Sequence, residues 1–284
     1  MKNLAWIDGN VCNLEEAKIP LEDRGFLFGD GVYEVIKVYN GKPFYLGAHL
    51  ERLQRSASAI SINIPYPYPD LVRYSCDLVE QSECDHGYLY LQVTRGCAPR
   101  GHLFPGNVSP TVVMYVRGFE SGPPDELAEP VDCITLPDER WLNCYIKTVN
   151  LLPNVLALQK AHEMDAGEAI LYRPDGTVTE GTRTNIFAVI EGTVKTHPET
   201  RYVLPGITRR IALDILEDLQ ISVLEEPFKV NDLAEASEVW TASTGMEILP
   251  VGTIDGRALK EPAPGPVCRQ VAEKFWEIVR SECY

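Results

Sequence analysis

A stretch rich in proline, glycine and acidic residues interrupts the middle of this sequence, and it constrains the fold more than any other feature. Residues Glu120 to Pro130 have the composition of an interdomain linker and lack the periodicity of a helix or a strand. The 284 residues, 45% of them hydrophobic, suffice for two cores. We therefore predict a smaller N-terminal domain at residues 1–119, a linker at 120–130 and a larger C-terminal domain at 131–284.

Helical and strand patterns occur in both halves. In the first half we expect strands at Trp6–Asn13, Val32–Tyr39, Tyr88–Thr94 and Thr111–Arg117, and helices at His49–Ile60 and Leu71–Glu80. In the second half we expect a strand at 131–136, several strands between 169 and 189, and helices ending near Met164, running from Gly206 to Leu219, and running from Pro266 to Glu282. This mixture predicts an α/β and α+β fold class.

Charge and cysteine content exclude several classes of protein. With a net charge of -15, the chain is a poor candidate for general binding to nucleic acid or to an anionic membrane. No apolar run is long enough to span a bilayer, and the start lacks the apolar core of a signal peptide. The eight cysteines lack Cys-x-x-Cys spacing, so we expect reduced, mostly buried thiols and no metal site. A cytoplasmic enzyme or binding protein is expected.

Lys147 is the residue with the clearest chemical potential. Tyr145 and Val149 lie two positions away on either side, so an extended chain places all three side chains on one face. An amine held against an apolar wall loses solvation, and its neutral form attacks carbonyl carbon. Asn150 is expected to cap a following helix, with Pro153 in the first turn. The ordinary alternative is a lysine at a strand end whose amine extends into water.

Two further patterns suit a phosphorylated aldehyde cofactor. Glu180 follows a predicted strand and precedes a glycine and small polar residues, which suits an acid placed against a pyridine nitrogen. Gly206 precedes a helix whose first amides, at Ile207 and Thr208, suit a phosphate, and the Thr208 hydroxyl adds a donor. Thr244 offers a similar donor. Taken alone, each pattern also fits an exposed glutamate or an ordinary helix start.

Three side chains are candidate ligands for anions. Arg52 lies at the edge of the apolar face of its predicted helix, from which a guanidinium reaches a phosphate bidentately. Arg100 and His102 lie two residues apart in a loop and form a candidate trap for a carboxylate. For each of the three, a solvated surface side chain is the alternative.

Several of these motifs together resemble the class IV, or fold-type IV, pyridoxal-phosphate aminotransferases, and most closely the D-amino-acid branch of that family. The matching segments are EDRGFLFGDGVYEVIKVYN at 22–40, QVTRGCAPRGH at 92–102, and the stretches 140–152, 177–187 and 206–209. They occur in order over nearly the whole chain. The resemblance implies a two-domain fold with a C-terminal pseudo-barrel, pyridoxal 5′-phosphate as cofactor, and a homodimer with a shared active site.

The resemblance also implies roles for individual residues. Lys147 bonds covalently to the cofactor aldehyde as the catalytic residue, and Glu180 pairs with the pyridine nitrogen. Tyr33 lies near the cofactor and the substrate carboxylate, and Val35 and Lys37 follow it along the same strand. The remaining roles are phosphate binding by Arg52, Ile207, Thr208 and Thr244, packing against the cofactor ring by Leu204, and a carboxylate trap of Arg100 and His102 contributed by the partner subunit.

The sequence departs from the pattern of the D-amino-acid branch in places: Gly245 and Met246 replace a threonine and a serine, and Arg183 stands where those enzymes have a small serine. The side chain of Arg183 either reaches the pocket and favours a second substrate carboxylate or turns outward into an ion pair.

The expected function is ping-pong transfer of an amino group between D-amino acids, of the D-alanine and D-glutamate class, and 2-oxo acids. The alternatives are an L-branched-chain or (R)-amine transaminase of the same fold, an aminodeoxychorismate lyase, and a non-catalytic binding protein.

Overall fold

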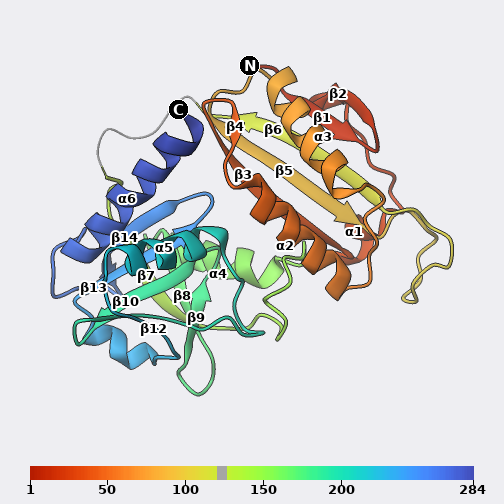
Figure 1. Ribbon diagram of the computed structural model, residues 1–284. Coiled ribbons are helices and arrows are strands. Elements are labelled where there is room, and N and C mark those ends of the chain that lie inside the picture. Colours follow the sequence, from red (N-terminus) through yellow and green to blue (C-terminus); the bar gives the residue numbers. More distant parts are fainter. Residues whose placement is uncertain (120–126) are drawn as a thin grey trace. The chain divides into compact units, whose positions relative to one another are not determined.

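The chain divides into two compact units. A computed structural model describes residues 1–119 and 127–284 (Figure 1). The first unit comprises residues 1–119, 146–150 and 279–284, and the second comprises 127–145 and 151–278. Part of the predicted linker, 120–126, lies outside the described residues. The division predicted from the linker assigns 146–150 and 279–284 to the second domain, so the compact units differ from it at these two segments.

The first unit is an antiparallel sheet with helices on one face, as Figure 1 shows for α2 and α3. The strand order is β2-β1-β6-β5-β3-β4. The strands are β1 (Leu4–Ile7), β2 (Asn10–Asn13), β3 (Gly31–Tyr39), β4 (Lys42–Pro43), β5 (Gly87–Thr94) and β6 (Thr111–Gly118). The helices are η1 (Leu14–Glu16), α1 (Arg24–Phe28), α2 (Leu46–Ala59) and α3 (Tyr68–Gln81).

The alternation along β3 decides which side chains belong to the core and which are available for function. Val32, Glu34 and Ile36 are fully buried on the face that carries the helices, where the core also includes Leu50 and Leu53 of α2. Successive side chains of a strand point to opposite faces. Tyr33, Val35 and Lys37 therefore lie on the other face, where they are partly exposed.

The second unit is built on a mixed sheet with the order β12-β11-β10-β13-β14-β7-β8-β9, to which β15 adds beside β14. Its strands are β7 (Val131–Pro137), β8 (Glu168–Tyr172), β9 (Val178–Gly181), β10 (Asn185–Ile190), β11 (Thr193–Thr196), β12 (Val223–Glu225), β13 (Glu238–Ser243), β14 (Glu247–Ile254) and β15 (Arg257–Ala258). Its helices are α4 (Leu152–Glu163), α5 (Ile207–Asp218), η2 (Val230–Ala234) and most of α6 (Pro266–Cys283).

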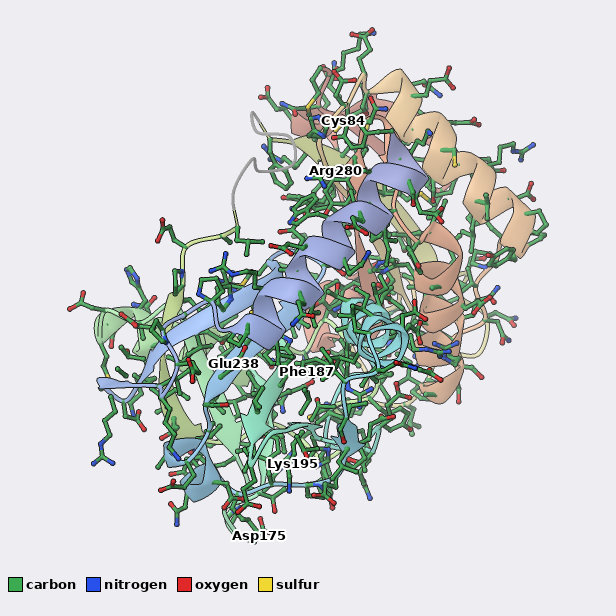
Figure 2. All side chains as sticks on the ribbon, turned by 60° about the vertical axis from the view of Figure 1, so that its left-hand side comes forward. Cys84, Asp175, Phe187, Lys195, Glu238 and Arg280 are labelled. Atoms are coloured by element: carbon green, nitrogen blue, oxygen red, sulfur yellow. The ribbon has the colours of Figure 1, made fainter. Side chains whose placement is uncertain are left out.

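Packing in the second unit follows directly from its strand pairs. Phe187, labelled in Figure 2, lies on β10 directly opposite Trp240 of β13, and the two rings stack with centroids 5.3 Å apart. The crossover from β7 to its parallel neighbour β8 contains α4, whose Ala161 packs on Ile134 and Leu171. Parallel strands require such a crossover, so this part is the predicted α/β element. The pseudo-barrel form of the unit stays a prediction.

The expected helices are confirmed, with most ends shifted by one to three residues. The segment around Lys147 is not a strand, so the extended arrangement considered for it is not observed. Its only bridge among the described residues joins Thr148 to Val32. Asn150 does not cap α4 either: the cap position is Leu151, without a side-chain bond, and the Asn150 amide donates to the Gly29 carbonyl at 2.7 Å. Gly29 has φ of 65°, and a Cβ there would meet the Asn150 side chain at 2.5 Å. This contact requires glycine and redirects Asn150.

All eight cysteines are free, and five of them are buried, as expected for reduced thiols. In the part of the chain that the structure describes, no helix combines the length and apolar character that a bilayer crossing needs.

Candidate active site

The predicted site residues divide between the two units, and each group is described within its own unit. The first unit contains Tyr33, Val35, Lys37, Arg52, Arg100, His102 and Lys147. The second unit contains Glu180, Arg183, Leu204, Ile207, Thr208 and Thr244.

Lys147 is fixed through its backbone and lies along an aromatic ring. Its N–H donates to the Ser56 hydroxyl at 3.2 Å, and its carbonyl accepts the Tyr33 N–H at 3.0 Å. The ammonium nitrogen lies 4.3 Å from the centroid of the Tyr33 ring. The apolar wall beside the amine is therefore Tyr33 and not Tyr145, which is exposed. The main chain holds the amine beside β3, where a partly buried nucleophile is available.

Arg52 belongs to a buried charge cluster beneath Lys147. Its Nε and Nη2 donate to the two oxygens of Glu34 at 2.7 and 2.8 Å, and His49 Nδ1 is 2.7 Å from the same carboxylate. Burial raises the pKa of Glu34, but the charge and hydrogen bonds of Arg52, helped by His49, lower it to about 2. Burial lowers the pKa of His49, and the positive charges of Arg52 and Lys147 lower it further against the opposing effect of Glu34. The cluster fixes the direction of the Arg52 guanidinium, whose binding of phosphate stays a prediction.

Glu34→Gln should lower the free energy of unfolding at pH 7 by about 3 kcal/mol, because it leaves Arg52 buried without its charge partner. The pKa of Glu34 in the folded state, about 2, lies below the ordinary value of 4.5. The stabilisation is therefore complete above pH 4.5 and is lost as the pH falls towards 2. Urea unfolding at pH 7 and pH 3 measures both effects. Glu51→Gln, at an exposed position of α2, is the matched control and should change little. Equal effects of the two substitutions at pH 7 would contradict the assignment.

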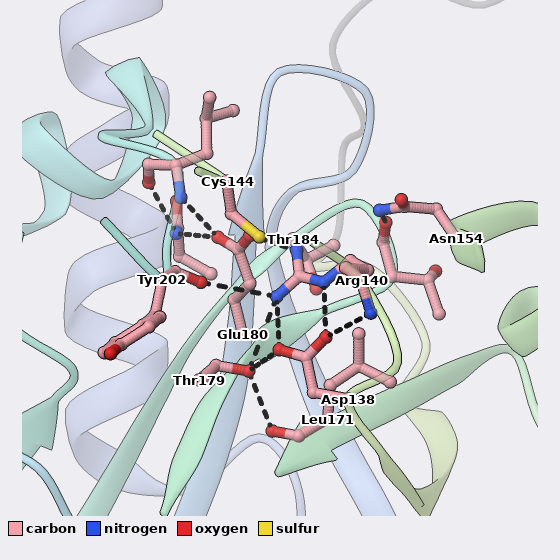
Figure 3. A network of polar contacts seen from close by, with 12 residues as sticks. Asp138, Arg140, Cys144, Asn154, Leu171, Thr179, Glu180, Thr184 and Tyr202 are labelled. Carbon is pink, nitrogen blue, oxygen red and sulfur yellow. Dashed lines mark hydrogen bonds and ion pairs between the residues drawn. The ribbon is translucent and has the colours of Figure 1, made fainter. Parts of the chain in front are cut away.

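Glu180 is the centre of a buried polar network in the second unit (Figure 3). One carboxylate oxygen accepts a short hydrogen bond from Arg140 Nη1. The other accepts from the Asn185 amide at 3.0 Å and from the Leu204 N–H at 2.8 Å. Burial raises the pKa of Glu180, and the Arg140 charge opposes this effect. A further cation beside the carboxylate, such as a protonated pyridine nitrogen, would also favour its ionised form.

Asp138 and Arg140 belong to this network but were not predicted from the sequence as site residues. Asp138 accepts from Arg140 Nε and Nη2 at 2.9 and 2.8 Å and from the Thr179 hydroxyl at 2.7 Å (Figure 3). Asp138 therefore orients the guanidinium that contacts Glu180. The Asp-x-Arg spacing before the lysine stretch was the available signal, but it is too common to identify the pair.

The start of α5 is open for an anion. Gly206 is its N-cap residue and, having no side chain, provides no side-chain cap for the first amides of this 12-residue helix. The start of α6 differs, because Glu238 accepts the N–H groups of Val267 and Cys268. Uncapped amides together with the helix dipole favour a phosphate, and Thr208 lies within the first turn of α5.

Asn185 connects the acid to the helix start. Its amide donates both to Glu180 and to the Leu204 carbonyl, and a Cβ at Gly206 would meet its side-chain oxygen at 2.1 Å. Asn185 pairs with Ala242 of β13. Thr244 follows Ala242 by two residues and therefore lies at the end of β13 that is next to Asn185. An acid and an open helix start held by one residue fit a pyridine ring that carries a phosphate arm.

Arg183 projects from a tightly held loop. Glu168, fully buried, accepts the Thr182 N–H and hydroxyl at 2.9 and 2.5 Å and the Thr184 hydroxyl at 3.0 Å. Between these two threonines, Arg183 is exposed and forms no ion pair within residues 1–119 and 127–284. The alternative of an outward ion pair is therefore not observed. Glu168 is another residue that sequence reasoning missed.

The structure brings Arg100 and His102 together on one ring. The Arg100 guanidinium carbon lies 5.2 Å from the Phe28 centroid, and the His102 ring lies 5.6 Å from it. Both residues are exposed, as a binding site for a substrate carboxylate requires.

Comparison with known proteins identifies the class. Residues 31–254 match the family model of Amino-transferase class IV, so the chain belongs to this family. It is 42% identical to a D-alanine aminotransferase of Staphylococcus haemolyticus, over 97% of this chain and 98% of that protein. A D-alanine aminotransferase of Bacillus licheniformis is 41% identical, over 97% and 96%.

A solved structure extends the likeness to the fold. The branched-chain aminotransferase of Thermoproteus uzoniensis, crystallised with norvaline, matches with a TM-score of 0.88 at 28% identity, over 99% of this chain and 96% of that one. The predicted fold class and enzyme class are thereby confirmed. Class IV aminotransferases are pyridoxal-phosphate enzymes, so the predicted cofactor is confirmed with them.

Proposed function

We propose that the protein transfers amino groups between D-amino acids, of the D-alanine and D-glutamate class, and 2-oxo acids by a ping-pong mechanism. The observation that carries the cofactor assignment is the Glu180 carboxylate joined through Asn185 to the uncapped start of α5. The D-amino-acid assignment is supported by the 42% identity to a D-alanine aminotransferase and by the pairing of Arg100 with His102 on Phe28.

Each residue of the second unit has a defined task in this proposal. Pyridoxal phosphate, when bound, supplies an aldehyde for the substrate amine and a protonated ring that withdraws electrons from Cα. Glu180 keeps the proton on the ring nitrogen. The amides of Ile207 and Thr208 and the hydroxyls of Thr208 and Thr244 bind the phosphate. Leu204 packs against the ring while its N–H orients Glu180.

The residues of the first unit have tasks at both the cofactor and the substrate. Lys147 would hold the cofactor covalently through its aldehyde in the resting enzyme. Once the substrate amine had taken its place on that aldehyde, the freed Lys147 amine would move the proton from Cα of the amino acid. Arg52 is the phosphate ligand proposed from this unit. Tyr33, Val35 and Lys37 line the substrate side of β3, and Tyr33 also shields the amine.

Handedness depends on the side of the cofactor from which the substrate carboxylate is held. Arg100 and His102 hold it, and they are contributed by the partner subunit of a homodimer. The trap then decides whether the Cα proton that faces Lys147 belongs to a D- or an L-amino acid.

The proposal includes a cytoplasmic location for the enzyme, which the free cysteines support because reducing compartments keep thiols unpaired.

An L-branched-chain transaminase is the second candidate, and the solved relative with norvaline favours it. An (R)-amine transaminase and an aminodeoxychorismate lyase of the same fold are the other enzyme alternatives. A non-catalytic binding protein is disfavoured by the presence of both Lys147 and Glu180, since binding alone requires neither.

Addition of D-alanine to the cofactor-saturated protein should bleach the near-visible absorption of the bound cofactor, because the amino group is transferred to it. L-Leucine at the same concentration should leave the band unchanged. Stopped-flow absorbance with a D- and L-amino-acid series gives the donor range. Bleaching by L-leucine and not by D-alanine would support the branched-chain alternative.

Lys147→Ala should retain the cofactor and lower kcat about a thousandfold or more, because proton transfer at Cα loses its base. Dialysis followed by phosphate analysis measures retention, and steady-state transamination measures kcat. Lys160→Ala, at an exposed position of α4, is the matched control and should keep full activity. Appreciable turnover by Lys147→Ala would remove this lysine from the mechanism.

Arg183→Ser should raise KM for D-glutamate about tenfold and change KM for D-alanine little, because the exposed guanidinium binds a second substrate carboxylate. Arg257→Ser, an exposed arginine of β15, controls for the loss of surface charge. Parallel changes in KM for both substrates would exclude a role for Arg183 in side-chain selection.

A further inference from the structure

We propose that Arg24, a buried arginine at the start of α1, is a positioning residue that fixes the loop of the carboxylate trap and thereby sets substrate affinity. We call residues 96–104 the trap loop. The inference rests on the proposed function of Arg100 and His102 and concerns the position of both side chains.

Arg24 contacts the trap loop between its two functional residues. Its Nη1 donates to the carbonyl of Gly101, the residue between Arg100 and His102, at 2.6 Å. The backbone N–H of Arg24 donates to the Gly96 carbonyl at 2.9 Å, at the beginning of the loop. One residue thus binds both the start of the trap loop and its centre.

The same guanidinium supports the ring on which the trap lies. Its carbon is 4.8 Å from the Phe28 centroid, and Arg100 and His102 lie 5.2 and 5.6 Å from that centroid. Phe28 is one turn beyond Arg24 in α1, so the ring and its support move as one element. The position of Phe28 therefore depends on the contact that also holds Gly101.

A partly buried carboxylate, that of Asp30, holds Arg24 and connects it to the far end of the loop. Arg24 Nε donates to Asp30 at 2.8 Å, and Arg95 donates to the two oxygens of Asp30 at 2.8 and 3.0 Å. The Arg95 guanidinium carbon lies 3.6 Å from the centroid of Phe104, at the end of the trap loop. Two arginines that share Asp30 therefore reach the loop at Gly101 and at Phe104.

The trap loop has little burial of its own to order it. Leu103 and Phe104 are 88% and 61% exposed, and Arg100 and His102 are exposed as well. Exposed loops with few buried contacts open at low free energy. Ala98, near the start of the loop, is buried and its N–H donates to the Glu22 carbonyl. Beyond Ala98, residues 99–104 are all exposed, and the hydrogen bond from Arg24 to Gly101 holds this part of the loop between the two trap side chains. An arginine suits this task because its planar fork donates to a carboxylate and a carbonyl at once.

The test compares Arg24→Met with Arg100→Ala and with the double variant, using D-alanine as donor. We expect Arg24→Met to raise KM about tenfold, to change kcat less than about twofold, and to leave the cofactor absorption unchanged. In the Arg100→Ala background the same change should raise KM less than about twofold, because the loop then has no arginine to position. Asp30 keeps its bidentate partner Arg95 in the variant, so no buried carboxylate is left unpaired.

Two controls separate positioning from general instability. Arg73→Met, at an exposed arginine of α3, should change neither KM nor the melting temperature. Arg24→Lys keeps the charge beside Asp30 without the fork, and it should raise KM while the protein stays folded. An unchanged KM in both Arg24 variants, or an equal rise in KM with and without Arg100, would overturn the inference. If Arg100→Ala itself leaves KM unchanged, the trap assignment of the proposed function fails instead.

Discussion

The candidate site depends on charges that are buried and therefore paired. A buried charge without a partner is too unfavourable to persist, so each buried functional charge requires a partner of opposite sign. Glu180 is held by Arg140, which Asp138 holds in turn. Arg52 is held by Glu34. This requirement fixes the direction of each functional group before any ligand binds, and such preorganisation limits the reorganisation that catalysis would otherwise need.

The two units use different elements for the same purpose. In the second unit, strands and a helix start carry residues proposed to bind the cofactor, and Asn185 connects the acid to the helix. In the first unit, a loop carries Arg100 and His102, which are proposed to bind the substrate, and two arginines that share Asp30 hold this loop. Strands and helices give precise positions for a cofactor that stays bound, whereas loops provide the variation on which substrate range depends.

The sequence predicts local features of the site well and their partners poorly. The open start of α5 follows from Leu-Pro-Gly-Ile-Thr, and the burial of Arg52 beside an apolar face follows from helical spacing. The pairs that hold these groups join residues far apart, with Arg140 and Glu180 separated by 40 residues and Arg95 and Asp30 by 65. Such pairs form where the fold brings together segments that are distant in the sequence, and the local spacing of residues does not encode them. The mistaken cap at Asn150 has the same cause, since its amide bonds to Gly29, 121 residues away.

Substrate range is the property that the fold leaves open, and the placement of the arginines explains why. The same architecture serves a branched-chain aminotransferase at 28% identity, so the sheet and its core do not select the substrate. Selection must therefore come from side chains that are exposed yet held by buried partners. Arg100, fixed through the Gly101 carbonyl, and Arg183, fixed between two threonines that bind Glu168, both meet this description. Arg100 suits the α-carboxylate that every amino acid has, and Arg183 suits a second carboxylate, which only some amino-acid side chains have.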